Sequence, residues 1–96
     1  MINLGNVKEG VKVSYEIGID LKKVPSKFEK TCPCVSIMVV TKRGEKTRRF
    51  IRVTFKPIRV PRSVRKKGYY LTEQKHKLSF TDGTKMPIEF KAKVVV

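Results

Sequence analysis

The stretch VKVSYEIGID, residues 11–20, alternates apolar and polar side chains over its whole length. Side chains along a β-strand point in turn to the two faces of a sheet, so a period of two predicts a strand with one buried face. The run is too regular in this period to be an amphipathic helix, whose apolar positions recur every three to four residues. The apolar positions assigned to the buried face are Val11, Val13, Tyr15, Ile17 and Ile19.

Similar runs and the turn signals between them extend this pattern along the chain. Residues 51–56, 75–80 and 88–96 also alternate. The run 35–40 is apolar on both faces, which predicts a more central strand. Proline and glycine separate the runs, and Asp82-Gly83 predicts a hairpin turn. No helical period is visible over any window of about 12 residues, so the chain is predicted to be all-β, a single antiparallel β-sandwich of about seven strands.

Four short motifs carry a resemblance to known domains. They are a glycine-framed opening segment, a Cys-x-Cys, an Ile-x-Val-x-Phe strand and a glycine followed by an aromatic residue. In this chain they are Leu4–Gly10, Cys32-Pro33-Cys34, residues 51–55 and Gly68-Tyr69. On these motifs the chain resembles a bacterial family of immunoglobulin-like domains of unassigned function, related to PapD-like and cilia-associated immunoglobulin-like domains. The resemblance implies one immunoglobulin-like sandwich over residues 1–96 and a binding or assembly role without catalysis.

Two features depart from that family pattern. Many bacterial members look exported, whereas the opening residues 1–10 have no apolar core of signal-peptide length, and no stretch approaches the roughly 20 apolar residues of a membrane span. The segment 42–67 is also more basic than the family pattern. Compact domains of this kind also occur as accessory or decoration proteins on phage particles. The expected location is therefore a virion or the cytoplasm, with no membrane partner.

Positive charge dominates the middle of the chain. The net charge is +15, and residues 42–67 hold 12 basic residues against one acidic residue and all seven arginines. Such an imbalance costs self-repulsion and indicates an acidic or polyanionic partner. Arg52 and Lys56 also form the solvent face of a strand, while the residues beyond Pro57 predict an extended basic loop. The residues predicted to bind the partner are Arg48, Arg49, Arg52, Lys56, Arg59, Arg62, Arg65, Lys66 and Lys67.

The remaining chemistry-bearing residues do not form a recognisable catalytic or metal site. Two cysteines and one histidine are too few for a structural zinc, which needs four ligands. Cys32 and Cys34 are separated by one residue, whereas redox motifs place two residues between their cysteines. The two cysteines are therefore predicted to be structural, reduced thiols, and His76 a semi-buried residue at a strand end. The sequence predicts no enzyme, no metal, no cofactor and no small-molecule substrate, and ranks a thiol redox enzyme as the third hypothesis.

Two kinds of partner fit the basic segment. The preferred one is the acidic protein surface of a larger assembly, where the chain would be a phage capsid, decoration or connector component, present in several copies. The alternative is a small nucleic-acid-binding protein without sequence preference, since Phe50, Tyr69 and Tyr70 lie close to the basic residues in sequence and aromatic rings stack on bases. No RNA-binding signature or helix-turn-helix accompanies them. We expect Tyr69 and Tyr70 to face opposite sides of a strand.

Overall fold

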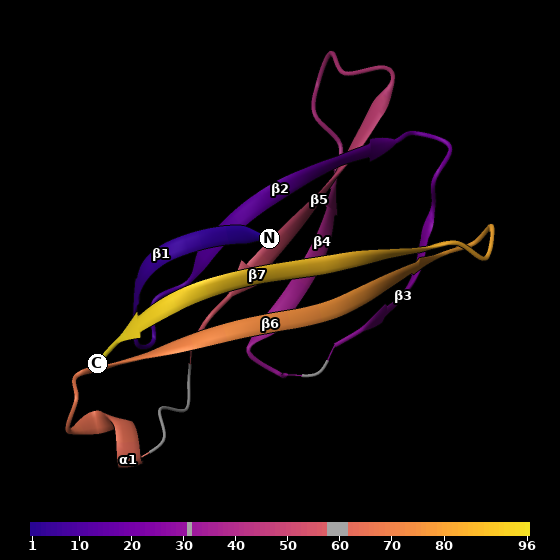
Figure 1. Cartoon of the computed structure of the whole chain (residues 1–96). Helices are drawn as coiled ribbons and strands as arrows, with labels where there is room; N and C mark the ends of the chain where they lie inside the picture. The colour runs from indigo at the N-terminus through magenta and orange to yellow at the C-terminus, as the bar shows by residue number, and fades with distance from the viewer. Residues whose placement is uncertain (31, 58–61) are drawn as a thin grey trace.

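The computed structural model describes residues 1–30, 32–57 and 62–96. It contains seven strands in two sheets, ordered β1-β7-β6-β3 and β2-β5-β4, with a single turn of helix between β5 and β6 (Figure 1). The elements are β1 Ile2–Lys8, β2 Val13–Asp20, β3 Pro25–Glu29, β4 Val35–Val40, β5 Arg48–Phe55, α1 Arg62–Arg65, β6 Tyr69–Phe80 and β7 Lys85–Val95. The prediction of an all-β sandwich is confirmed.

The strand order follows the immunoglobulin pattern. The second, fifth and fourth strands form one sheet, and the third, sixth and seventh form the other, as in immunoglobulin domains. The first strand joins the second of these sheets by pairing parallel to β7, whereas the other pairs in the described residues are antiparallel. The C-terminal strand β7 therefore lies inside its sheet, between β1 and β6, as the figure also shows (Figure 1).

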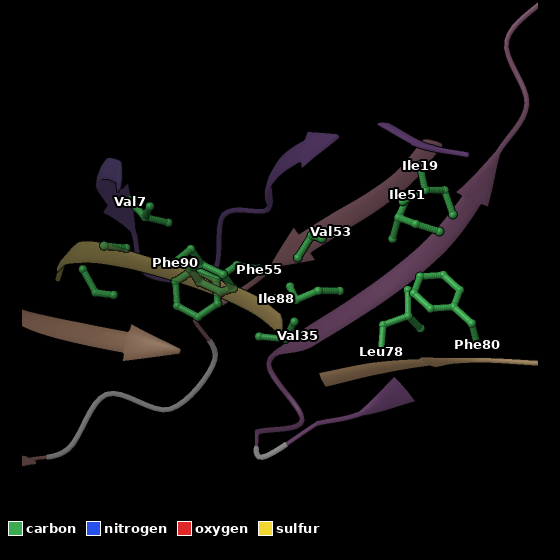
Figure 2. Packing of buried hydrophobic residues seen from close by; sticks show 12 residues of the cluster. Val7, Ile19, Val35, Ile51, Val53, Phe55, Leu78, Phe80, Ile88 and Phe90 are labelled. Carbon is green, nitrogen blue, oxygen red and sulfur yellow. The ribbon is translucent and has the colours of Figure 1, made fainter. Parts of the chain in front are cut away.

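The core is formed where the inward residues of the two sheets meet. Phe55 of β5 and Phe90 of β7 lie at its centre, with ring centroids 5.2 Å apart (Figure 2). Burying a side chain of this size stabilises the fold by about 1.5–3 kcal/mol. The predicted inner faces of residues 51–56, 75–80 and 88–94 are confirmed, whereas Val96, the last apolar position of the predicted alternation, follows β7 and is 40% exposed. The buried residues that confirm them are Ile51, Val53, Phe55, His76, Leu78, Phe80, Ile88, Phe90, Ala92 and Val94.

The turn between β6 and β7 is the predicted hairpin at Asp82-Gly83. Gly83 has a φ of 86°, a conformation in which a Cβ would be strained. The Asp82 carboxylate accepts a hydrogen bond from the Thr84 backbone N–H at 2.9 Å. It also pairs with Lys23 Nζ at 2.6 Å. Lys23 and these polar contacts hold the pKa of the Asp82 carboxyl far below its usual range.

Several predicted positions differ from the structure. Val11 precedes β2 and is 47% exposed, because the chain is still turning after Gly10. Residues 35–40 form an edge strand and not a central one, since among the described residues β4 pairs with β5 alone. The central strand of that sheet is β5, which carries the basic residues. On the outward face of β4, Met38 is exposed and Val40 is half-buried.

The segment after β5 also differs from its prediction. It was predicted as an extended loop, but residues 62–65 form the helical turn α1. Arg59 lies outside the described residues. In the described parts of the chain, no helix has the length and apolar character needed to cross a membrane.

Candidate docking surface

The alternation of β5 divides the basic run between the two faces of its sheet. Arg48 and Arg52 point outward from the sandwich, and Lys56 follows the strand on the same side. Arg49 points to the inner side at the end of the strand, where its Nη1 donates to the Lys23 carbonyl at 3.1 Å. Arg49 is one of the residues predicted to bind the partner, and in the structure its hydrogen bond ties β5 to the turn after β2.

Glu16 neutralises part of the outward charge. It lies directly across from Arg52 in the register of β2 and β5, and its carboxylate contacts Arg52 Nη2 at 3.4 Å and Lys42 Nζ at 2.9 Å. The hydrogen bond from Lys42, with the charges of Lys42 and Arg52, holds the pKa of the Glu16 carboxyl below its usual range. Asp20 lies across from Arg48 in the same way. Positive and negative side chains therefore lie next to each other at this end of the outer face.

The other end of the same face contains a shallow depression of about 440 Å³. Three cationic side chains and three hydroxyls line it, and none of the described residues that line it is acidic. Ammonium, guanidinium and hydroxyl groups all donate hydrogen bonds to anionic oxygens. We call this site the hydroxyl-lined depression. Its residues are Lys12, Ser14, Pro33, Cys34, Ser36, Met38, Arg52, Thr54 and Lys56.

The strand register brings the hydroxyls of this depression together. Thr54 of β5 lies across from Ser14 of β2 on one side and Ser36 of β4 on the other. The hydroxyls of Ser14 and Thr54 are 3.0 Å apart. Lys12, Ser14 and Ser36 were not predicted as site residues. Their polar alternation is visible in the sequence, but their common neighbour on β5 follows only from the strand pairing.

The remaining predicted basic residues form a separate group, the corner cluster of Arg62, Arg65, Lys66 and Lys67. All four are exposed and lie around α1, just before β6. Arg65 Nη2 contacts the Glu9 carboxylate at 3.2 Å, which anchors this corner to the turn between β1 and β2. Figure 1 shows α1 at the opposite end of the molecule from the β4–β5 loop. The corner cluster therefore lies far from the start of the basic run, which is in the β4–β5 loop.

Cys32 and Cys34 are joined by a disulfide bond, so the expectation of reduced thiols is wrong. With one residue between them, their Cα atoms are 5.3 Å apart, within the range that a disulfide spans. Cys34 packs against the core, and its carbonyl accepts a hydrogen bond from the Lys56 N–H at 2.9 Å. The bond therefore shapes the chain where it enters β4, at the rim of the hydroxyl-lined depression.

His76 is buried inside β6 and does not lie at a strand end. It is 2% exposed, because β6 begins at Tyr69, six residues earlier than the alternating run predicted. Its ring stacks on Phe90 with centroids 6.3 Å apart, and its Nε2 shares a hydrogen bond with Gln74 Oε1 at 3.2 Å. Burial, and after it the charge of Lys30, lowers the pKa of His76. These contacts make His76 part of the packed interior.

The aromatic residues near the basic run are not gathered on its surface. Tyr69 and Tyr70 face opposite sides of β6, as predicted, with Tyr70 packed against the core. Tyr69 lies on the outer face of the other sheet, where Lys93 Nζ is 4.3 Å from its ring centroid. Phe50 shares the outer face of β5 but is half-buried, with Lys42 Nζ 4.3 Å from its ring centroid.

No group of three or more histidine, cysteine, aspartate or glutamate side chains that could hold a metal ion occurs in residues 1–30, 32–57 and 62–96. Comparisons with protein-family models, with curated proteins and with solved structures found no match.

Proposed function

We propose that the protein is a non-enzymatic binding module that docks on an acidic protein surface of a larger assembly. The observation that carries this proposal is the hydroxyl-lined depression, where Lys12, Arg52 and Lys56 surround three hydroxyls and no acidic residue is in the lining. Glu16 contacts Arg52 from outside the depression, at 3.4 Å. Carboxylates of a partner would meet charged and neutral donors there. The resemblance to immunoglobulin-like domains supports a phage particle as the assembly, with the chain as a capsid, decoration or connector component.

The composition of the outer face favours a protein partner over nucleic acid. Glu16 and Asp20 interrupt the cations on this face. A nucleic-acid backbone presents a continuous line of negative charge that would meet these carboxylates, whereas a protein surface can place its carboxylates opposite the cations alone. Binding of single-stranded nucleic acid usually combines cations with exposed aromatic rings. Phe50 lies under Lys42, and Tyr69 lies on the other sheet.

The test compares two triple variants that remove the same charge from different sheets. The first replaces Lys12, Arg52 and Lys56 by serine, and the second replaces Lys27, Lys77 and Lys91, which are exposed on the other sheet. Binding to poly-L-glutamate and to random duplex DNA is measured over a salt series. We expect the first variant to lose at least about tenfold in affinity for polyglutamate, and the second at most about threefold.

Two results would contradict the proposal. Equal losses in both variants would mean that polyglutamate responds only to net charge. Tight DNA binding at physiological salt, with a salt slope that falls by about one unit for each cation removed from the depression, would indicate a nucleic-acid partner instead.

A further inference from the structure

The four edge strands of the sandwich differ in how they discourage pairing with another chain. Native edges are commonly protected by charges, prolines or irregular registers. The registers of β1 and β3 are irregular, and β2 carries the carboxylates of Glu16 and Asp20. By contrast, β4 is regular, and its sequence VSIMVV contains no charged residue and no proline. Among the edges, β4 therefore has the fewest features that oppose the addition of a further strand.

The backbone of β4 offers hydrogen-bonding groups on its open side. The Lys56 N–H donates to the Cys34 carbonyl at 2.9 Å, and backbone bonds in an antiparallel pair alternate between neighbouring residues. The backbone groups of Ile37 and Val39 consequently point away from β5. No strand in the described part of the chain pairs with that side of β4.

The side chains of β4 are incompletely covered on both faces. Val39 shares the inner face with the fully buried Val35, yet it is 45% exposed. Met38 on the outer face is 57% exposed and lies directly across from Arg52. An added strand would cover Val39 with its own inward side chains, and its outward side chains would lie beside Met38.

We propose that β4 accepts an extended peptide of alternating apolar and acidic residues as a fourth strand of its sheet. Neighbouring strands are about 4.8 Å apart, so this peptide would run about 10 Å from β5. Outward glutamates of the peptide and the long side chains of Arg52 and Lys56 together span that gap. The choice of an acidic partner rests on the function proposed above, whereas the mode of binding rests on the backbone and burial of β4.

A second copy of the chain fits this edge poorly. Each copy has a net charge of +15, and pairing two β4 edges would bring the two sets of Arg52 and Lys56 toward each other. Like charges facing each other across an interface oppose association. An acidic peptide reverses the sign of this interaction.

The probe is a synthetic eight-residue peptide of alternating valine and glutamate. Two comparison peptides keep its length and its four glutamates: one has its central valines replaced by proline, which removes backbone N–H groups, and one has its residues in blocks. Affinity is measured by fluorescence anisotropy, and amide hydrogen exchange of Ile37 and Val39 is followed by NMR. We expect only the alternating peptide to slow exchange at these two amides.

The matched variants are Val39→Pro and Val39→Thr. Proline removes the N–H that faces the open edge without breaking a bond to β5, whereas threonine keeps the N–H and the branched shape. Circular dichroism and thermal unfolding confirm that each variant folds. We expect Val39→Pro to weaken the alternating peptide at least about tenfold and Val39→Thr to change its affinity by less than about threefold.

The outcomes separate this inference from the proposed function. If all three peptides bind equally to both variants without protecting Ile37 and Val39, the acidic docking surface stands and strand addition is refuted. If no acidic probe binds, including polyglutamate, both proposals fail. If the free protein forms a dimer that Val39→Pro abolishes, the edge belongs to a second copy and the peptide proposal is overturned.

Discussion

The outer faces of the two sheets both carry many basic residues, but they place their carboxylates differently. On the β1-β7-β6-β3 sheet, the glutamates alternate with lysines along neighbouring strands, as in the pairs Glu73–Lys91 and Glu89–Lys75. On the β2-β5-β4 sheet, Glu16 and Asp20 lie toward one end, and the other end is the hydroxyl-lined depression. Unbalanced positive charge on a sheet thus depends on the register of the carboxylates more than on the number of basic residues.

The first prediction concerns the core between the two sheets, where a substitution should lower the free energy of unfolding most. Replacing Phe90, which is 0% exposed, by alanine is expected to cost about 3–5 kcal/mol of unfolding free energy, because it leaves a cavity between the sheets. The control is Leu71→Ala, since Leu71 is 76% exposed and its loss should change stability by less than about 0.5 kcal/mol. Urea denaturation measures both.

Deletion of residues 90–96 should abolish cooperative unfolding, and a folded truncation would contradict the placement of β7 inside its sheet.

The second prediction concerns the disulfide beside the depression. Replacing Cys32 and Cys34 by serine should lower the unfolding free energy by at most about 2 kcal/mol, because the loop that the bond closes is very short. Polyglutamate binding by the folded variant should stay within about twofold of the original affinity. A well-folded double variant that no longer binds would show that the cysteines do more than shape the start of β4.

The third prediction concerns a variant that gives the hydroxyl-lined depression a carboxylate, as the other end of the outer face already has. Ser36→Glu places a carboxylate in the hydroxyl-lined depression, where it should compete with an acidic ligand for Arg52 and Lys56. We expect polyglutamate affinity to fall about tenfold, or about 1.4 kcal/mol. Leu71→Glu changes the net charge equally on the other sheet and should have a much smaller effect. Equal effects in a binding titration would contradict the assignment of the site.

The last prediction concerns a variant that extends the unbalanced positive charge along the outer face and should change affinity only modestly. Glu16→Gln releases Lys42 and Arg52 from their carboxylate partner, so polyglutamate should bind about threefold more tightly, with a steeper dependence on salt. The control is Glu73→Gln, which removes one carboxylate from the other sheet. Unchanged binding in Glu16→Gln would mean that the ligand does not reach Arg52.

The lowered pKa of Glu16 sets the pH range for this measurement. A carboxyl whose pKa is depressed in the folded state contributes stability above the pKa of the unfolded chain and loses it as pH falls through the folded-state pKa. Lys42 and Arg52 lower this pKa, so Glu16 is fully charged at pH 7. The two variants are therefore best compared at pH 7, and their difference should shrink in acid as Glu16 becomes protonated.

Local features of the chain were predictable because they depend on neighbouring residues. The alternation around Ile51 and Phe90 identifies strands and their buried faces, and Asp82-Gly83 identifies a hairpin, since both signals act over a few residues. The sign of the net charge is also a property of composition. The candidate site was only partly predictable: Arg52 and Lys56 were identified correctly as outward, whereas Arg49 was not separated from them.

The period of each strand, the position of the β6–β7 turn and the excess of positive charge can all be read from the order of the amino acids. The folded arrangement of the strands makes β5 central and β4 an edge. It also pairs Glu16 with Arg52 and places Ser14 beside Thr54. The two residues of the Glu16–Arg52 contact are 36 positions apart in the sequence, and those of the Ser14–Thr54 contact are 40 positions apart. Such pairings depend on which distant strands pair and in what register, because shifting one strand by a single residue would move every side chain to the opposite face.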